Sequence, residues 1–294
     1  MSSNWVMKGM IGFYILLFFL YLFGPLMVMS ITAFNTPAYP QAIPFEGFTL
    51  NWFVKLWNHR AMMEGIRNSF IIGFGVVAIS VPVGLAASIV MNQIYHRARG
   101  VFYLVTISPV LTPGVIIGIS TVIFWKDMLG HFDVTKVLFY KGIILAILGQ
   151  SSFVAAYCLL IIMARLQRFD RALEEAALDL GASYPQVFWH ILLPFLKPAL
   201  ISAAVIAFLS SFENYNTTTF AILADKTLVT VLAGEVRQGT TPALSALAVI
   251  IISISLAGAI IYEVMKRREE AAHERVKERA KLAERSDEVI AIPT

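Results

Sequence analysis

A single acidic residue, Glu213, interrupts a long apolar stretch of the chain. Phe212 precedes it, and Asn214 and Tyr215 follow it. A carboxylate beside an aromatic ring is suited to bind a cationic amine, because the carboxylate supplies the opposite charge and the ring face adds cation–π attraction. These four residues therefore form a candidate site for a positively charged solute.

A helix-packing role for Glu213 is equally open. Its carboxylate could bond to a polar side chain of a neighbouring helix, and the hydroxyls of Thr217, Thr218 and Thr219 could act in the same way. A charge at the centre of a bilayer costs about 2.5–3.5 kcal/mol on insertion scales. In either role we expect Glu213 to face protein or water and not lipid.

Other chemistry is poorly represented. The chain contains no Gly-Lys dipeptide, so it lacks the phosphate-binding loop G-x-x-x-x-G-K-[ST] and should bind no ATP of its own. Its one cysteine, Cys158, lies in an apolar stretch and should be a small buried side chain. The 5 histidines show no metal-ligand spacing. We expect no catalytic residues, no metal site and no cofactor bound by this chain.

The composition places the chain in a membrane. Of its 294 residues, 58% are hydrophobic and 14% are charged, and the mean hydropathy is +0.73. Soluble domains are about half apolar and a quarter charged. The basic pI of about 9.1 arises largely from Lys and Arg beside apolar segments and in the C-terminal tail. That distribution favours membrane topology over nucleic-acid binding.

Six segments have about the 20 mostly apolar residues that a transmembrane helix needs. They are Met10–Ile31, Ser69–Met91, Gly100–Trp125, Gly142–Ala164, Pro198–Ala224 and Gln238–Tyr262. The first is too long for the apolar region of a signal peptide and no clear cleavage site follows it. The sequence predicts an all-α membrane protein with six spans and both termini on one side. Lys and Arg are nearly balanced between the two sets of loops, so charge alone does not orient the chain.

The connection between the fourth and fifth spans, about residues 165–197, has a helical pattern of its own. An apolar stripe is formed by Phe169, Ala172, Leu173, Ala176 and Leu180. Gly181 follows where a helix end favours a left-handed residue, and Ser183 and Pro185 suit the start of a second helix that ends near Pro194. The sequence predicts an amphipathic helix–turn–helix that lies against the membrane end of the bundle or against a partner.

This segment resembles the coupling loop of ABC importer permeases, whose pattern is E-A-A, three residues, G, nine residues and I-x-L-P. The matching residues are Glu175, Ala176, Ala177, Gly181, Ile191, Leu193 and Pro194, with Glu174 directly before them. The resemblance implies a type I importer transmembrane domain over residues 1–268, followed by a charged cytoplasmic tail over 269–294. It also implies that the loop and both termini are cytoplasmic, in a bacterial inner membrane.

The same resemblance implies the partners. The chain would form half of a translocation pathway with a second permease subunit, which we expect to be a homologous heterodimer partner, although no residue of the sequence excludes a homodimer. Two ATPase subunits, which carry ATP and Mg²⁺, would drive alternating access through the coupling loop. A periplasmic or extracellular binding protein would deliver the solute.

Three further segments of the chain, with less specific motifs, resemble the second-permease type of spermidine/putrescine importers. An acidic residue follows a Ser-Phe pair there, as Glu213 follows Ser211-Phe212, and Val236-Arg237-Gln238-Gly239 resembles the approach to the sixth span. Pro113-Gly114-Val115 resembles the third span, although Gly114 stands where an acidic residue is usual. Polyamines are the expected solute. An importer for an amino-acid derivative, iron, thiamine or a sulfate-like solute, or an ATP-independent secondary transporter, stays open.

Overall fold

All regular secondary structure in the described part of the chain is helical. The computed structural model describes residues 3–128, 141–258, 260–261, 263–264 and 267. Within these ranges the only β-type pairing is an isolated bridge between Asn35 and Phe48. The expected all-α class is confirmed. The predicted tail, 269–294, lies outside the described residues.

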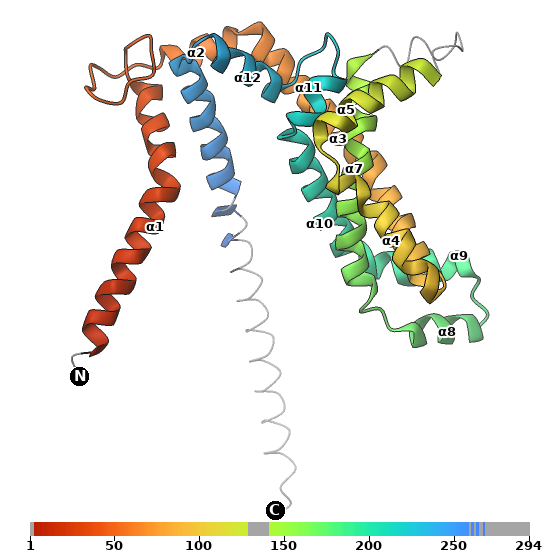
Figure 1. The fold of residues 1–294 in the computed structure, drawn as a ribbon. Helices are drawn as coiled ribbons and strands as arrows, with labels where there is room; N and C mark the ends of the chain where they lie inside the picture. The colour runs from red at the N-terminus through yellow and green to blue at the C-terminus, as the bar shows by residue number, and fades with distance from the viewer. Residues whose placement is uncertain (1–2, 129–140, 259, 262, 265–266, 268–294) are drawn as a thin grey trace, which may run out of the picture. The chain divides into compact units, whose positions relative to one another are not determined.

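The described helices follow one another in the order shown in Figure 1. They are α1 (Ser3–Phe34), α2 (Asn51–Asn58), α3 (Arg60–Gln93), α4 (His96–Leu111), α5 (Gly114–Ile123), the π-helix η1 (Phe124–Met128), α7 (Gly142–Leu166), α8 (Arg171–Asp179), α9 (Tyr184–Val187), the π-helix η2 (Phe188–Leu192), α10 (Leu193–Phe212), α11 (Asn216–Ala221), α12 (Leu228–Gln238) and a helix over Pro242–Gly258.

The chain divides into two compact units, residues 1–57 with 240–294 and residues 58–239. In the first unit α1 is strongly apolar, and nearly all of its large hydrophobic side chains are exposed. A helix that is apolar around its whole circumference suits lipid. Thr32 Oγ1 donates a hydrogen bond of 2.8 Å to Ser245 Oγ and so joins α1 to the helix Pro242–Gly258.

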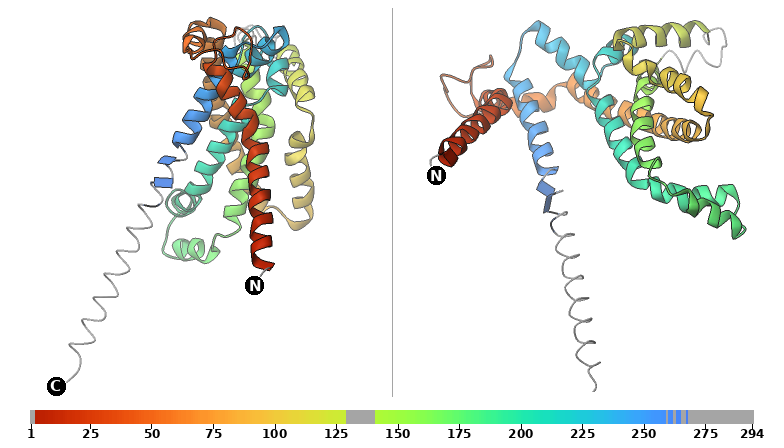
Figure 2. Two further views of the ribbon diagram at one scale, coloured as in Figure 1. Left: turned by 90° about the vertical axis from the view of Figure 1, so that its left-hand side faces the viewer. Right: turned by 60° about the horizontal axis from the view of Figure 1, so that its bottom comes forward.

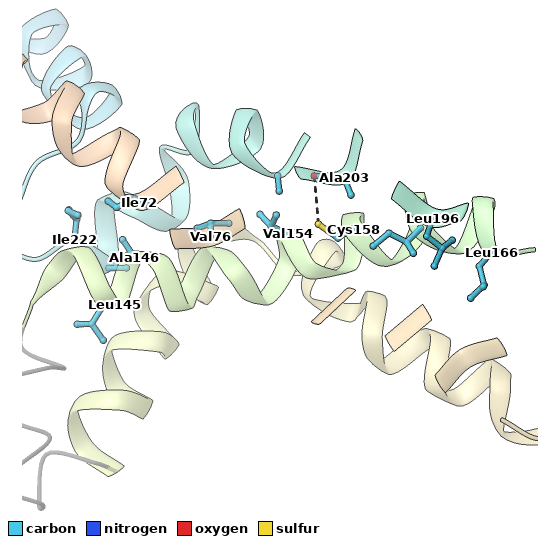
Figure 3. Close-up of a cluster of buried hydrophobic side chains, with 13 residues drawn as sticks. Ile72, Val76, Leu145, Ala146, Val154, Cys158, Leu166, Leu196, Ala203 and Ile222 are labelled. Carbon is cyan, nitrogen blue, oxygen red and sulfur yellow. Dashed lines mark hydrogen bonds between the residues drawn. The ribbon is translucent and has the colours of Figure 1, made fainter. Parts of the chain in front are cut away.

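The second unit is built on α3, α7 and α10, which pack along one another (Figure 2). Close approach of α3 and α7 requires Gly84, because a Cβ there would lie 2.5 Å from Cys158 Cβ and 2.8 Å from Leu159 N. Figure 3 shows the buried cluster along these helices, in which Cys158 Sγ lies 3.9 Å from Ala203 O. Cys158 is fully buried, as predicted.

The predicted third span is bent. Together α4 and α5 are long and apolar enough to form one span, but they meet at an angle of 99°. Thr112 has φ −84° and ψ 131°, an extended conformation, because the ring of Pro113 disfavours helical geometry in the preceding residue. The predicted span Gly100–Trp125 is therefore two helices joined at a sharp bend.

The predicted fifth span, Pro198–Ala224, is displaced toward the N-terminus. Helix runs from Tyr184 through η2 and α10 to Phe212, so the expected helix end near Pro194 is wrong. Pro194 lacks an amide hydrogen and its ring crowds the preceding turn. The wider π-turn, in which Leu193 N donates to Phe188 O, accommodates that proline without ending the helix.

Among the described residues, four helices are long and apolar enough to cross a membrane, or five if α4 and α5 count as one span. The predicted sixth span begins later than expected, because Gly239 (φ +125°) ends α12 after Gln238 and the next helix starts at Pro242. Its described part, Pro242–Gly258, is shorter than a full span. A multi-pass membrane protein is therefore supported.

Replacing Gly84 by Val should separate α3 from α7. Overpacking costs about 1–3 kcal/mol of stability, so the apparent melting temperature of the purified protein in detergent should fall. Gly100→Val is the matched control, because a Cβ at Gly100 meets nothing within 4 Å. Equal melting temperatures for the two variants would contradict close α3–α7 packing.

Candidate functional site

Glu213 lies in a break between two helices. α10 ends at Phe212 and α11 starts at Asn216, so Glu213, Asn214 and Tyr215 connect them without α-helical structure. The expectation that Glu213 sits inside a continuous span is therefore wrong. Its side chain is exposed, and it makes no hydrogen bond or ion pair with the described part of the chain.

The break is caused by Asn214. Its Oδ1 accepts hydrogen bonds from Thr217 N (3.1 Å), Thr218 N (3.2 Å) and Thr218 Oγ1 (3.1 Å). An asparagine that bonds to backbone groups ahead of it competes with the helical bonds and starts a new helix. Asn214 thus satisfies the first amides of α11 and lets the chain change direction after Glu213.

A buried amide lies behind the break. Gln150 of α7 is fully buried and bonds to both sides of the break: its Oε1 accepts from Ser211 Oγ at 2.5 Å, and its Nε2 donates to Thr218 Oγ1 at 2.7 Å. Ser211 belongs to α10 and Thr218 to α11. The break is therefore tied to α7 at both of its ends.

The bend between α4 and α5 packs against the same region. A Cβ added at Gly114 would lie 2.9 Å from Thr217 Oγ1 and 3.1 Å from Asn216 Cβ, and one at Gly118 would lie 2.6 Å from Thr217 O. The contact with α11 leaves little space for a side chain at Gly114. The two irregular stretches of the second unit meet at these glycines.

The two aromatic candidates have different surroundings. Phe212 packs edge-on against Phe70 with ring centroids 5.3 Å apart and stacks on Phe208 at 5.7 Å. The hydroxyl of Tyr215 accepts a hydrogen bond of 3.0 Å from a guanidinium nitrogen of Arg237 in α12. Both rings are partly buried on either side of the exposed Glu213.

Sequence reasoning did not assign a role to Gln150 or Arg237. Gln150 is a polar residue in a predicted apolar span, and that exception to the pattern is a signal that could have indicated a buried polar contact. Arg237 belongs to the motif Val236-Arg237-Gln238-Gly239, which gives no information on what its side chain contacts. Which side chains they contact depends on how α7 and α12 pack against the break.

The turn after α8 has the geometry expected of Gly181. Its φ is +88°, which only glycine adopts readily. Gly181 N donates to Leu178 O (2.9 Å) and Ala182 N to Ala177 O (3.0 Å), the paired bonds of a Schellman motif. The predicted left-handed helix end is confirmed. The predicted second helix also starts as expected, with Pro185 in its first turn and Gln186 Oε1 accepting from Ser183 N at 2.7 Å.

Apart from Phe169, the apolar stripe along α8 is uncovered. Leu173 is 54% exposed and Leu180 is 89% exposed, and α8 has no buried residue. Glu175 and Ala176 are also exposed, whereas Glu174 and Ala177 are partly buried. Glu174 lines a hollow of about 190 Å³ with residues of α3 and α7, and Gly181 and Ile191 line a second one of about 470 Å³. Leu193 is partly buried and Pro194 is exposed.

The segment is attached to the bundle at its start. Phe169 packs edge-on against Phe195 of α10, with centroids 5.2 Å apart. Arg165 of α7 lies 4.2 Å from the centre of the Phe195 ring and donates to Phe195 O at 3.3 Å. Arg171 donates to Asn92 O at the end of α3 at 3.4 Å. Within the second unit α8 and α9 lie at one end, and α5 and α11 lie at the other, with α7 and α10 running between them (Figures 1 and 2).

Comparison with known proteins identifies related sequences. Residues 80–270 match the family model described as "binding-protein-dependent transport system inner membrane component". The chain is 28% identical over 259 residues to the putrescine transport system permease protein PotI of Escherichia coli K12, covering 87% of this chain and 90% of that protein. It is 26% identical over 260 residues to the spermidine/putrescine permease protein PotC of Haemophilus influenzae, covering 84% and 93%.

Solved structures share the fold. A bacterial ABC transporter involved in import of the acidic polysaccharide alginate has a chain with a TM-score of 0.66 at 19% identity, covering 91% of this chain and 96% of that one. The inward-facing methionine transporter MetNI has a chain with a TM-score of 0.51 at 21% identity, covering 71% and 93%.

Replacing Asn214 by Ala should destabilise the start of α11. Loss of a capping side chain costs about 0.5–2 kcal/mol, so the apparent melting temperature in detergent should fall. Asn216→Ala provides the matched control, because Asn216 is exposed and its side chain has no hydrogen bond within the described residues. If both variants melt at the wild-type temperature, Asn214 does not hold the break.

Proposed function

Because the chain belongs to the family of binding-protein-dependent transport system inner membrane components, and is therefore a transport subunit and not an enzyme, we propose that it carries polyamines such as putrescine and spermidine. The observation that supports this proposal most directly is the exposed Glu213 in the helix break. The names of the related permeases point to the same solutes.

The break supplies what a protonated amine requires. The Glu213 carboxylate has no internal partner within the described residues, so its charge is available to an ammonium group. Phe212 and Tyr215 flank it and offer apolar and ring surface to a methylene chain. The Tyr215 hydroxyl accepts a hydrogen bond from the Arg237 guanidinium, and we therefore assign binding of the cation to the Glu213 carboxylate. Irregular backbone within a membrane is tolerated where it lines a cavity or is buried in protein, and discontinuous helices commonly form transporter binding sites.

Coupling to ATP hydrolysis is assigned to the exposed face of α8 and the turn after it. In this proposal two ATPase subunits hold ATP and Mg²⁺, and one of them docks on the apolar stripe of α8 while the other docks on the second permease. The docking segment comprises Glu174, Glu175, Ala176, Ala177, Gly181, Ile191, Leu193 and Pro194. The exposure of Leu173 and Leu180 supports a partner there, because an apolar face left in water is unfavourable.

The complete transporter requires further subunits. A second permease, a homologous heterodimer partner, forms the other half of the pathway, and an external binding protein delivers the solute. In the membrane this chain then has six spans, with the bent α4–α5 pair as the third and the helix from Pro242 as the sixth. Residues 1–268 form the transmembrane domain, and both termini and the tail 269–294 are cytoplasmic.

Replacing Glu213 by Gln removes the charge and keeps the shape. Uptake of radiolabelled putrescine by cells that express the complete transporter should fall at least about tenfold, since a charge-assisted hydrogen bond contributes about 1.5–3 kcal/mol. Glu64→Gln is the control, because Glu64 is an exposed glutamate of α3 without a hydrogen bond or ion pair in the described part of the chain. Its uptake should be unchanged.

Two gene deletions test the identity of the solute and the dependence on ATP separately. If deletion of the gene for this chain leaves putrescine and spermidine uptake intact, the polyamine proposal fails, and an amino-acid derivative, iron, thiamine or a sulfate-like solute must be tested. If uptake continues after the cognate ATPase is deleted, the chain acts as a secondary transporter.

Replacing Gly181 by Val should uncouple transport from ATP hydrolysis. Nothing lies within 4 Å of a Cβ at this position, so the strain arises from the positive φ alone, and a β-branched side chain tolerates it poorly. The variant should assemble, but uptake should fall while the ATPase of the complex no longer responds to the loaded binding protein. Gly181→Asn should retain most of the coupling, since asparagine accepts the left-handed conformation. Normal uptake by Gly181→Val would remove this turn from the mechanism.

A further inference from the structure

Gln150 is a buried polar residue in a helix face that is otherwise apolar. Ala146 and Val154, one turn before and after it on α7, belong to the buried cluster of the second unit. An apolar side chain could fill this position without burying an amide, which costs about 1–3 kcal/mol when the amide is unpaired. Packing alone therefore does not require glutamine here. The Gln150 amide instead has partners that fix its orientation.

Those partners form a chain with one direction. Ser211 Oγ donates to Gln150 Oε1, and Gln150 Nε2 donates to Thr218 Oγ1. The Thr218 hydroxyl has one proton and gives it to Asn214 Oδ1 at 3.1 Å. Each hydroxyl therefore has a defined role, and the chain ends on the side chain next to Glu213.

The two ends of this chain belong to different helices. Ser211 lies in the last turn of α10, two residues before Glu213, and Thr218 lies in α11, five residues after it. The Gln150 amide thus spans the break and holds its two edges at a fixed separation. It also orients the Asn214 amide, whose Oδ1 faces the backbone amides of α11.

We propose that Gln150 is a positioning residue for the solute site, because its amide bridges α10 and α11 across the break that presents Glu213. It touches no solute itself. It keeps the Glu213 carboxylate in one place relative to α11 and therefore sets the affinity for the cation. This inference rests on the proposed role of Glu213 in polyamine transport.

The test compares Gln150→Leu with Ser151→Ala in the complete transporter. Ser151 is the next residue of α7, and its buried hydroxyl has no hydrogen-bond partner in the described part of the chain. Hydrogen exchange of the amides over 209–221 should rise in Gln150→Leu and stay unchanged in Ser151→Ala. In proteoliposomes with binding protein, the KM for putrescine should rise about tenfold in Gln150→Leu while kcat stays within about twofold, as expected when ground-state binding is weakened.

A mutant cycle tests whether the chain acts as one unit. Ser211→Ala alone should raise the KM for putrescine, but it should add little to Gln150→Leu, because the bond that it removes is already lost. Ser211→Ala is also the smaller change, so it decides the question by hydrogen exchange and KM if Gln150→Leu fails to assemble.

Three results would overturn the proposal. The first is exchange over 209–221 that is the same in Gln150→Leu, or in its substitute Ser211→Ala, as in Ser151→Ala. The second is a loss of kcat with an unchanged KM, which would indicate a role in the transport step. The third is additive effects in the cycle. If the wild-type complex does not import putrescine at all, the proposed function fails, and hydrogen exchange still decides whether Gln150 positions the break.

Discussion

The constraint on which this structure depends is that backbone polar groups inside a membrane must be satisfied by the protein itself. A break such as the one at Glu213 releases amides and carbonyls from their helical bonds. Asn214 Oδ1 accepts from the backbone amides of Thr217 and Thr218 at the start of α11. Gln150 pairs with the side-chain hydroxyls of Ser211 and Thr218 on the two sides of the break. The Glu213 carboxylate is therefore exposed while the amides of Gln150 and Asn214 behind it are paired, although the buried Thr217 hydroxyl has no partner within the described residues.

The same helices connect the break with the segment proposed to meet the ATPase. α7 carries Gln150 near one end and Arg165 near the other, and α10 carries Ser211 and Phe195 in the same way. Glycine contacts, such as that of Gly84 with α7, pack α3 tightly along this pair. Under the proposed function, these packed helices are the physical connection between α8 and the break, since packed interiors deform little.

Local features were predictable because short-range chemistry determines them. Gly181 adopts its left-handed conformation because the helix end requires it, and α8 begins and ends where the stripe indicated. Helix continuity was less predictable. Pro194 was expected to end a helix, but an adjacent π-turn accommodates it, whereas the break at Glu213 occurs in a stretch without proline.

The amino-acid sequence by itself determined the apolar character of the helices, the helix end at Gly181 and the presence of one carboxylate among apolar residues, because hydropathy and helix-end chemistry are properties of neighbouring residues. Only the tertiary structure decided that Glu213 lies in a break and that Gln150 and Arg237 reach it. These contacts join residues from helices far apart in the chain, and the pairing of polar groups across helices depends on how the helices pack.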